Sequence, residues 1–385
     1  MFQMKDVSSR VDVAIDAALA EHRIVGTVVL AAKGGTPFYT RAAGFADREA
    51  GRVMAPDSLF RLSSVSKVYI SVAAMVLVKQ GILALDAPVT RWLPDFRPSS
   101  PDGSQSDITI RHLLSHKAGL GYGFLEPADG PYHQAGVSDG MDIVDITLED
   151  NVRRISSIPL LFAPGTSWSY SLATDVLGLV IEHATHLPLA KAIQGLVMEP
   201  LGLTDTAFVV RDFNRLAAGY VDDGGVPRRM ADLEIIPLPF VEGSEGLRMA
   251  PARAFDDNAF PSGGAGMIGS ANDLLAVLEM LRSGGFPLLS SAEIQAMLTD
   301  QTPEIDLLPW PGRGFGLGFT LLRDPVSAQS PEPVSTWRMG GAYGHSWFVD
   351  PINELTVVAF TNAGLEGQSP GGRFPDDLTR AFYEG

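Results

Sequence analysis

The sequence contains, at positions 59–69, the stretch Leu59-Phe60-Arg61-Leu62-Ser63-Ser64-Val65-Ser66-Lys67-Val68-Tyr69, in which Ser64 and Lys67 form a Ser-x-x-Lys pair. An apolar run with helical spacing extends from Val68 to Leu85, so we expect a helix that begins near Ser64. Side chains three residues apart share one face of a helix, which lets the Lys67 amine reach the Ser64 hydroxyl. A buried lysine has a lowered pKa and can act as the base that activates a serine. The alternative is an N-cap serine followed by a solvated lysine.

The composition is that of a globular protein with a large core. The chain has 385 residues, of which 45% are hydrophobic and 19% are charged, and its length allows one large domain or two lobes. A net charge of −16 argues against nucleic acid or an anionic membrane as the main partner. The sequence has no cysteine, which excludes disulfides and thiolate metal sites.

The N-terminal segment is expected to form an amphipathic helix rather than a targeting sequence. Residues 1–21 carry several charges and lack the basic start and unbroken apolar core of a signal peptide. No apolar run reaches the length of a membrane span without a charge. We therefore expect a cytoplasmic protein.

The predicted elements follow the order strands, helices, strands. Glycines at 34 and 35 indicate a hairpin between strands at 26–32 and 37–45, and residues 209–262 are expected to be a lid or loops over the core. Helices are predicted at 108–116, 147–157, 172–184, 189–197, 270–281, 292–299 and 375–383, and further strands at 316–322, 342–349 and 355–361. This order favours an α/β (α+β) protein, in which an antiparallel sheet from both chain ends is flanked by helices and carries an inserted helical region. The predicted domains are 1–61 with 263–385, which form the sheet domain, and 62–262, which is mainly helical, with the active site at their junction.

A second motif surrounds Tyr170. The segment Pro164-Gly165-Thr166-Ser167-Trp168-Ser169-Tyr170-Ser171 is a tight turn that places a tyrosine just before a buried helix. A phenol beside an ammonium group should ionise more readily and can relay a proton between nucleophile and leaving group. The alternative is a tyrosine that only packs at the start of the helix.

A third motif is Met339-Gly340-Gly341-Ala342, in a β-rich run near the end of the chain. Glycines inside a strand indicate that another group approaches the backbone closely. Acyl transfer requires two N–H groups directed at the developing oxyanion, and we expect the amides of Ser64 and Ala342, the latter on an edge strand, to supply them. A simple bulge or turn is the alternative.

These three motifs, in this order and spacing, resemble the serine β-lactamase and penicillin-binding-protein fold, and more narrowly the class C β-lactamase-related esterases known as family VIII carboxylesterases. The resemblance covers nearly the whole chain. It implies that Ser64 is acylated, that Lys67 and Tyr170 share the role of base, and that backbone N–H groups of Ser64 and Ala342 form the oxyanion hole.

Two departures from the β-lactamase pattern bear on the substrate. Leu172 stands where β-lactamases have asparagine, and Met339 stands where they have lysine and the esterases have tryptophan. The apolar Met339 favours an uncharged ester, and strand alternation should turn the neighbouring Arg338 to the opposite face. The expected substrate-binding residues are Tyr132, Trp168, Met339, Gly340, Gly341 and Trp347, with Tyr122 and Phe124 as further candidates for the pocket wall.

Several alternatives remain open at this point. His345 and Asp350 could form a Ser-His-Asp triad with Ser64 or Ser346. We expect no metal and no cofactor, because the sequence has no ligand cluster such as His-Glu-x-x-His. The leading function is a serine esterase for small uncharged ester molecules that also transfers acyl groups to alcohols. The others are a hydrolase of β-lactams or D-amino-acid amides, and a non-catalytic binding protein.

Overall fold

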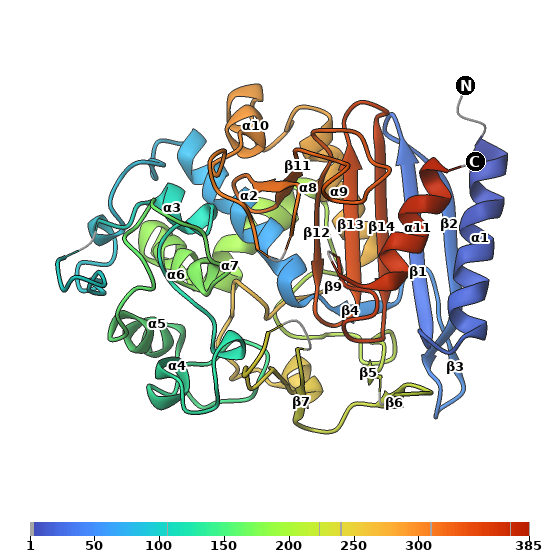
Figure 1. Ribbon diagram of the computed structural model, residues 1–385, viewed down its shortest axis with the longest axis horizontal. Coiled ribbons are helices and arrows are strands. Elements are labelled where there is room, and N and C mark those ends of the chain that lie inside the picture. Colours follow the sequence, from blue (N-terminus) through green and yellow to red (C-terminus); the bar gives the residue numbers. More distant parts are fainter. Residues whose placement is uncertain are drawn as a thin grey trace.

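The computed structural model describes residues 4–105, 107–222, 224–238, 241–308, 310–369 and 371–384. Within these ranges the largest sheet has eight strands in the order β10-β11-β12-β13-β14-β1-β2-β3, and all of its pairings are antiparallel. Its strands are β1 (Gly26–Lys33), β2 (Thr36–Asp47), β3 (Arg52–Val53), β10 (Arg313–Phe315), β11 (Thr320–Leu322), β12 (Trp337–Gly341), β13 (His345–Asp350) and β14 (Leu355–Thr361). The expected antiparallel sheet built from both ends of the chain is confirmed: β1 and β14 lie side by side in Figure 1.

Helices cover both faces of this sheet. Helices α1 (Met4–Ala20) and α11 (Arg373–Tyr383) pack together on one face (Figure 1), and α9 (Ala271–Arg282) packs against β1 and β14 from the other. Val29 and Ala31 of β1 join the first layer, whereas Val28 and Leu30 join the second. A strand buried on both faces is apolar throughout, which is why β1 shows no polar alternation. Residues 1–3 of the expected N-terminal helix lie outside the described residues.

The middle of the chain is helical and surrounds α2 (Ser66–Lys79). Every residue of α2 from Ser66 to Leu77 is buried, as expected of a helix that is apolar on all sides. Its end is earlier than the sequence analysis predicted, because the chain turns at Gly81, where φ is +72°. The surrounding helices are α3 (Ile110–Leu114), α4 (Pro131–Gln134), α5 (Leu148–Ser156), α6 (Ala173–Thr185), α7 (Leu189–Ile193) and α8 (Glu199–Leu201). None of the described helices is long and apolar enough to cross a membrane.

Two predicted strands differ from the structure. The segment 316–322 is not one strand, because the chain turns at Gly318 (φ +116°) between β10 and β11. The strand expected at 342–349 begins only at His345, since residues 342–344 form the turn that joins β12 to β13. Helix α10 (Ser291–Leu298), predicted at 292–299, begins with a capping box of Ser290 and Glu293.

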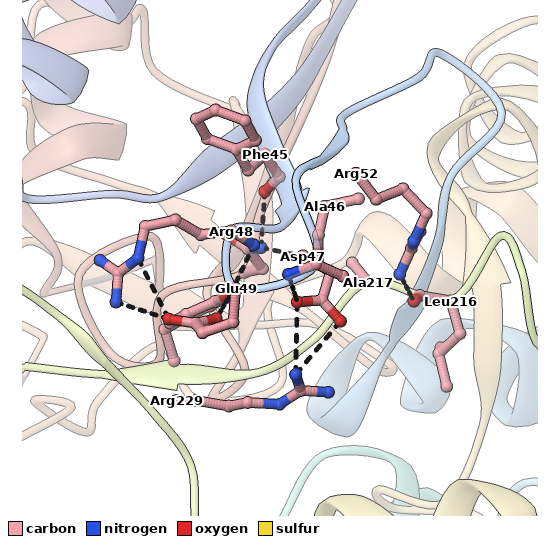
Figure 2. Close-up of polar contacts among 12 residues, drawn as sticks. Phe45, Ala46, Asp47, Arg48, Glu49, Arg52, Leu216, Ala217 and Arg229 are labelled. Atoms are coloured by element: carbon pink, nitrogen blue, oxygen red, sulfur yellow. Dashed lines mark hydrogen bonds and ion pairs between the residues drawn. The ribbon is translucent and has the colours of Figure 1, made fainter.

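Residues 209–262 form two small hairpins that are tied to the sheet. One pairs β5 (Tyr220–Val221) with β6 (Arg228–Arg229), and the other pairs β7 (Glu234–Ile236) with β8 (Leu247–Met249). Figure 2 shows Arg229 reaching Asp47 at the end of β2, at 3.2 Å, and Arg52 donating to the carbonyl oxygen of Leu216, at 2.6 Å. These contacts hold residues 209–262 beside the main sheet. The two-domain division stays a prediction.

Asn362 is a buried side chain that joins three strands through backbone contacts. Its Oδ1 accepts a hydrogen bond from Gly26 N (2.9 Å), and its Nδ2 donates to the carbonyl oxygen of Phe45 (3.0 Å). We expect Asn362→Ala to lower the free energy of unfolding by about 3 kcal/mol, because both backbone groups lose their partner in a buried setting. Urea denaturation would measure this. The control Asn258→Ala, at an exposed position, should change the value by less than about 0.5 kcal/mol. Equal midpoints for the two variants would contradict the assigned role of Asn362.

Candidate active site

Ser64 lies in a short 3-10 turn, Ser63–Val65, that leads directly into α2. The turn is anchored on both sides: Leu62 N donates to Met267 O (2.8 Å), and Ser63 Oγ accepts from Tyr343 N (3.3 Å). Ser63 has a positive φ of 43°, a conformation that costs energy in a residue other than glycine. Its neighbours are buried, but Ser64 itself is only half-buried and faces the cavity. The local structure therefore presents one hydroxyl to the cavity and fixes the backbone around it.

Lys67 lies one turn further along and is buried. Its Nζ is 3.2 Å from Ser64 Oγ and donates to the Gly264 carbonyl oxygen at 2.8 Å. Burial lowers the pKa of Lys67 to about 7, against the smaller opposing effect of the carboxylates of Asp175 and Asp139. A large fraction of the lysine is then neutral near neutral pH, in hydrogen-bond reach of the serine. The expected proximity of the pair is confirmed.

Tyr170 completes a cluster with Lys67, but its ionisation differs from our expectation. The Lys67 Nζ lies 4.7 Å from the centre of the Tyr170 ring, over the face of the ring. Burial raises the pKa of Tyr170 above its ordinary value, and the nearby Ser64 hydroxyl opposes this shift only in part. The Tyr170 hydroxyl is buried and makes no hydrogen bond of normal geometry with the residues that the structure describes. Tyr170 is therefore a neutral phenol, available as a proton donor.

The strand that leads to Ala342, β12, is not an edge strand as expected, because it lies between β11 and β13 in the sheet. The end of β12 next to Ala342 nevertheless has no partner on one side among the strands that the structure describes. β11 pairs only with Trp337 and Arg338, which leaves the half of β12 from Met339 onward open toward the cavity. The amides of Ser64 and Ala342 donate to no acceptor among the described residues. Glycine is required at 341, since a Cβ there would stand 2.4 Å from the Leu62 carbonyl oxygen. Close approach of the backbone is thus the reason for the glycines.

A cavity of about 890 Å³ opens over Ser64. Its wall near the serine is mainly aromatic and aliphatic, and it includes the predicted Trp168, Met339, Gly340 and Gly341. Tyr122 and Phe124 also line it and stack on each other, with ring centres 4.4 Å apart. Lining residues that were not predicted include Met141, Leu238 and Trp310, which lie outside helices and strands, and Leu247 at the start of β8; none of them has a local sequence signal.

Two predicted pocket residues are not in the cavity wall. The Tyr132 hydroxyl accepts a hydrogen bond from Gly121 N (2.7 Å) and so supports the loop that carries Tyr122 from behind. Trp347 packs under the sheet against Trp337 and Phe319, with ring centres 6.0 Å from each. Strand alternation in β13 directs Trp347 into the core, and its prediction as a pocket residue was wrong.

Comparison with known proteins identifies the family. Residues 11–378 match the family model described as Beta-lactamase. The chain belongs to the beta-lactamase family. All three motifs, which contain Ser64, Tyr170 and Met339, lie within the matched residues.

Several relatives of this beta-lactamase family member are esterases or acyltransferases by name. The chain is 49% identical over 364 residues to Esterase EstB of Burkholderia gladioli, and the aligned region covers 94% of this chain and 92% of the relative. It is 26% identical over 388 residues to Lovastatin esterase of Penicillium rubens, with 92% of each covered. The solved structure of EstCE1, a hydrolase with promiscuous acyltransferase activity, superposes with a TM-score of 0.94 at 43% identity, over 99% of both chains.

The structure excludes the alternative triad of His345 and Asp350. Asp350 accepts hydrogen bonds from Tyr383 Oη (2.6 Å) and Asn353 Nδ2 (2.7 Å) instead of a histidine. The Nε2 atom of His345 lies 2.7 Å from the Arg61 carbonyl oxygen, and burial lowers the pKa of His345 to about 4. His345 is a packing residue between Phe60 and Phe360. Among the described residues, no cluster of acidic, histidine or cysteine side chains could hold a metal ion.

We expect His345→Ala to keep the rate at which a fluorophosphonate labels the serine hydroxyl of this site. The variant should lose about 2 kcal/mol of stability, because it leaves a cavity and frees the Arg61 carbonyl oxygen. Intact mass after timed labelling, together with urea denaturation, measures both effects. Ser64→Ala serves as the unlabelled control. Loss of labelling in a folded His345→Ala protein would support the triad of His345 and Asp350 instead.

Proposed function

We propose that this protein is a serine carboxylesterase that hydrolyses small uncharged esters through an acyl-enzyme on Ser64. The observation that carries the proposal is the buried Lys67 amine, 3.2 Å from the Oγ of Ser64, which lines a largely apolar cavity. The esterase names of relatives at 49% and 26% identity support it. We further propose that the protein belongs to the family VIII carboxylesterases and acts in the cytoplasm.

In the acylation step, neutral Lys67 removes the proton of Ser64 as Oγ attacks the ester carbonyl carbon. The negative charge that develops on the carbonyl oxygen is stabilised by the amides of Ser64 and Ala342, which have no acceptor among the described residues. Tyr170 then donates its phenolic proton to the departing alkoxide and recovers a proton from Lys67. These roles follow from the two opposite pKa shifts, which make Lys67 the base and Tyr170 the acid.

In the deacylation step, a water molecule takes the place of the alcohol and the same proton transfers run in reverse. An alcohol that binds there instead accepts the acyl group, which makes acyl transfer a natural side reaction. The solved EstCE1 structure is named for such promiscuous acyltransferase activity, which supports the same capacity in this chain.

An uncharged substrate fits the cavity better than a β-lactam carboxylate. Met339 supplies no cation. Arg338 is one of the residues that line the cavity, but its guanidinium donates to Thr379 Oγ1 (3.0 Å) and lies over the Phe348 ring. Arg338 also pairs with the fully buried Glu332, a carboxylate that it shares with Arg313. Hydrolysis of β-lactams or D-amino-acid amides is the alternative function, and a comparison of turnover between substrates tests it.

We expect a burst of p-nitrophenol and an acyl adduct in the intact mass when the protein is mixed with p-nitrophenyl acetate. Ser64→Ala should show neither, and Lys67→Ala should acylate slower by about a thousandfold or more, since the base is lost. Penicillin turnover should be far below ester turnover. An adduct that persists in Ser64→Ala would refute the proposed nucleophile, and comparable penicillin turnover would favour the β-lactamase alternative.

The pH dependence of the reaction should report the ionisation of Lys67. Because burial lowers the pKa of this base to about 7, kcat/KM should be constant above that pH. Below it, kcat/KM should fall about tenfold per pH unit as the amine becomes protonated. Initial rates with p-nitrophenyl acetate measure the profile. A midpoint close to the ordinary lysine value would show that Lys67 is not the base.

A further inference from the structure

The buried carboxylate of Asp175 has no role in the mechanism above. We propose that Asp175 is a positioning residue that acts through Gly264 to hold Lys67 in place and to set its charge state. This inference rests on the proposed function, because it concerns the base of that reaction. It adds a fourth ionisable residue to the three that the motifs supplied.

The position of Asp175 in the fold favours a negative charge. It lies in the first turn of α6 and is fully buried. Amide groups at the start of a helix stabilise anions, which offsets part of the cost of burying a carboxylate. Neither carboxylate oxygen has a hydrogen-bond partner of normal geometry in the described part of the chain. A carboxylate in this state is stabilised by a nearby positive charge, and the protonated form of Lys67 is such a charge.

Gly264 connects the two residues directly. A Cβ added at Gly264 would stand 2.5 Å from Asp175 Oδ2, so the carboxylate rests against the backbone of this glycine. The carbonyl oxygen of the same residue accepts the hydrogen bond from Lys67 Nζ at 2.8 Å. Gly264 does not have a positive φ, so space for the carboxylate, rather than backbone conformation, explains a glycine here.

The charges around the pair define what Asp175 can do. Burial lowers the pKa of Lys67, and Asp175 is the largest influence that opposes it, ahead of Asp139. Burial raises the pKa of Asp175, which the Ser262 hydroxyl, Lys67, the Gly264 amide and Arg253 oppose. Asp139 accepts from Gly123 N (2.9 Å) and Phe124 N (2.8 Å), and its pKa is raised to about 7. The other ionisable groups that face Lys67 or Asp175 are Ser64, His116, Tyr122 and Tyr170.

The expected effect of Asp175→Asn has a definite sign. Removal of the anion makes the ammonium form of Lys67 less favourable, so the pKa of Lys67 falls further. The acid limb of the kcat/KM profile should move to lower pH by about one unit, as expected for the loss of one close opposite charge. The plateau should fall by up to about tenfold, because an amine of lower pKa is a weaker base.

The experiment measures kcat/KM for p-nitrophenyl acetate from about pH 5 to about pH 9, a range that brackets the acid limb, in the full chain and its variants. Asp273→Asn is the matched control: Asp273 is also a buried carboxylate in the first turn of a helix, but its partners are Thr206 Oγ1 (2.8 Å) and Asp205 N (3.0 Å). This control should keep the wild-type acid limb. Thermal unfolding of each variant checks that it is folded.

Each outcome decides the proposal. An acid limb that is unchanged in folded Asp175→Asn, or equally shifted in Asp273→Asn, overturns it. If Asp175→Asn gives no folded protein, the variant Gly264→Ala is measured instead. Its added Cβ moves the Asp175 carboxylate away from Gly264 without removing the carboxylate from the protein. An acid limb that is unshifted in Gly264→Ala overturns the proposal. Full activity in Lys67→Ala would refute the proposed function itself, whereas an inactive Lys67→Ala with an unshifted Asp175→Asn refutes only the role of Asp175.

Discussion

The structure depends on one costly arrangement: a lysine amine, that of Lys67, enclosed in protein and separated from water. A buried ammonium loses its hydration, and the protein responds by lowering the pKa of the amine rather than by enclosing a full charge. This requires a dry environment on every side, which is why α2 is apolar all round and lies at the centre of the helical region. The same dryness raises the pKa of Tyr170. One physical condition thus produces a base and an acid a few ångströms apart.

A second condition is the contact between the serine turn and the β12–β13 hairpin. Ser63 has a strained backbone, and its hydroxyl accepts a hydrogen bond from Tyr343 N. Gly341 lies so close to Leu62 that no side chain fits between them. These segments are far apart in the sequence, and their contact places two backbone amides on one side of the cavity. Here the geometry comes from the backbone, so the sequence shows it only through the glycines.

The sequence allowed prediction of those features that depend on local chemistry. The spacing of Ser64 and Lys67 and the apolar pattern of β1 each have a physical meaning within a few residues. Features that depend on distant packing could not be read in this way. Trp347 and Tyr132 are aromatic and near the motifs, but strand alternation and a bond to Gly121 direct them elsewhere. Trp310 reaches the cavity from a loop and Leu247 from the short strand β8, and nothing in the sequence around either residue indicates this.

The pairing of β1 with β14 also has a consequence for how the chain is made. The register joins Thr27 to Thr361, so an interior pair of strands of the sheet forms between segments that are far apart in the sequence. During synthesis, β1 and β2 leave the ribosome as an isolated hairpin, which is of marginal stability in water. Nearly the whole chain must be synthesised before β14 is available to pair with the open edge of β1. Such long-range closure is slow and leaves an apolar strand open to wrong partners in the meantime. Until β14 is available, the open edge of β1 is therefore the part of this sheet most exposed to wrong pairing.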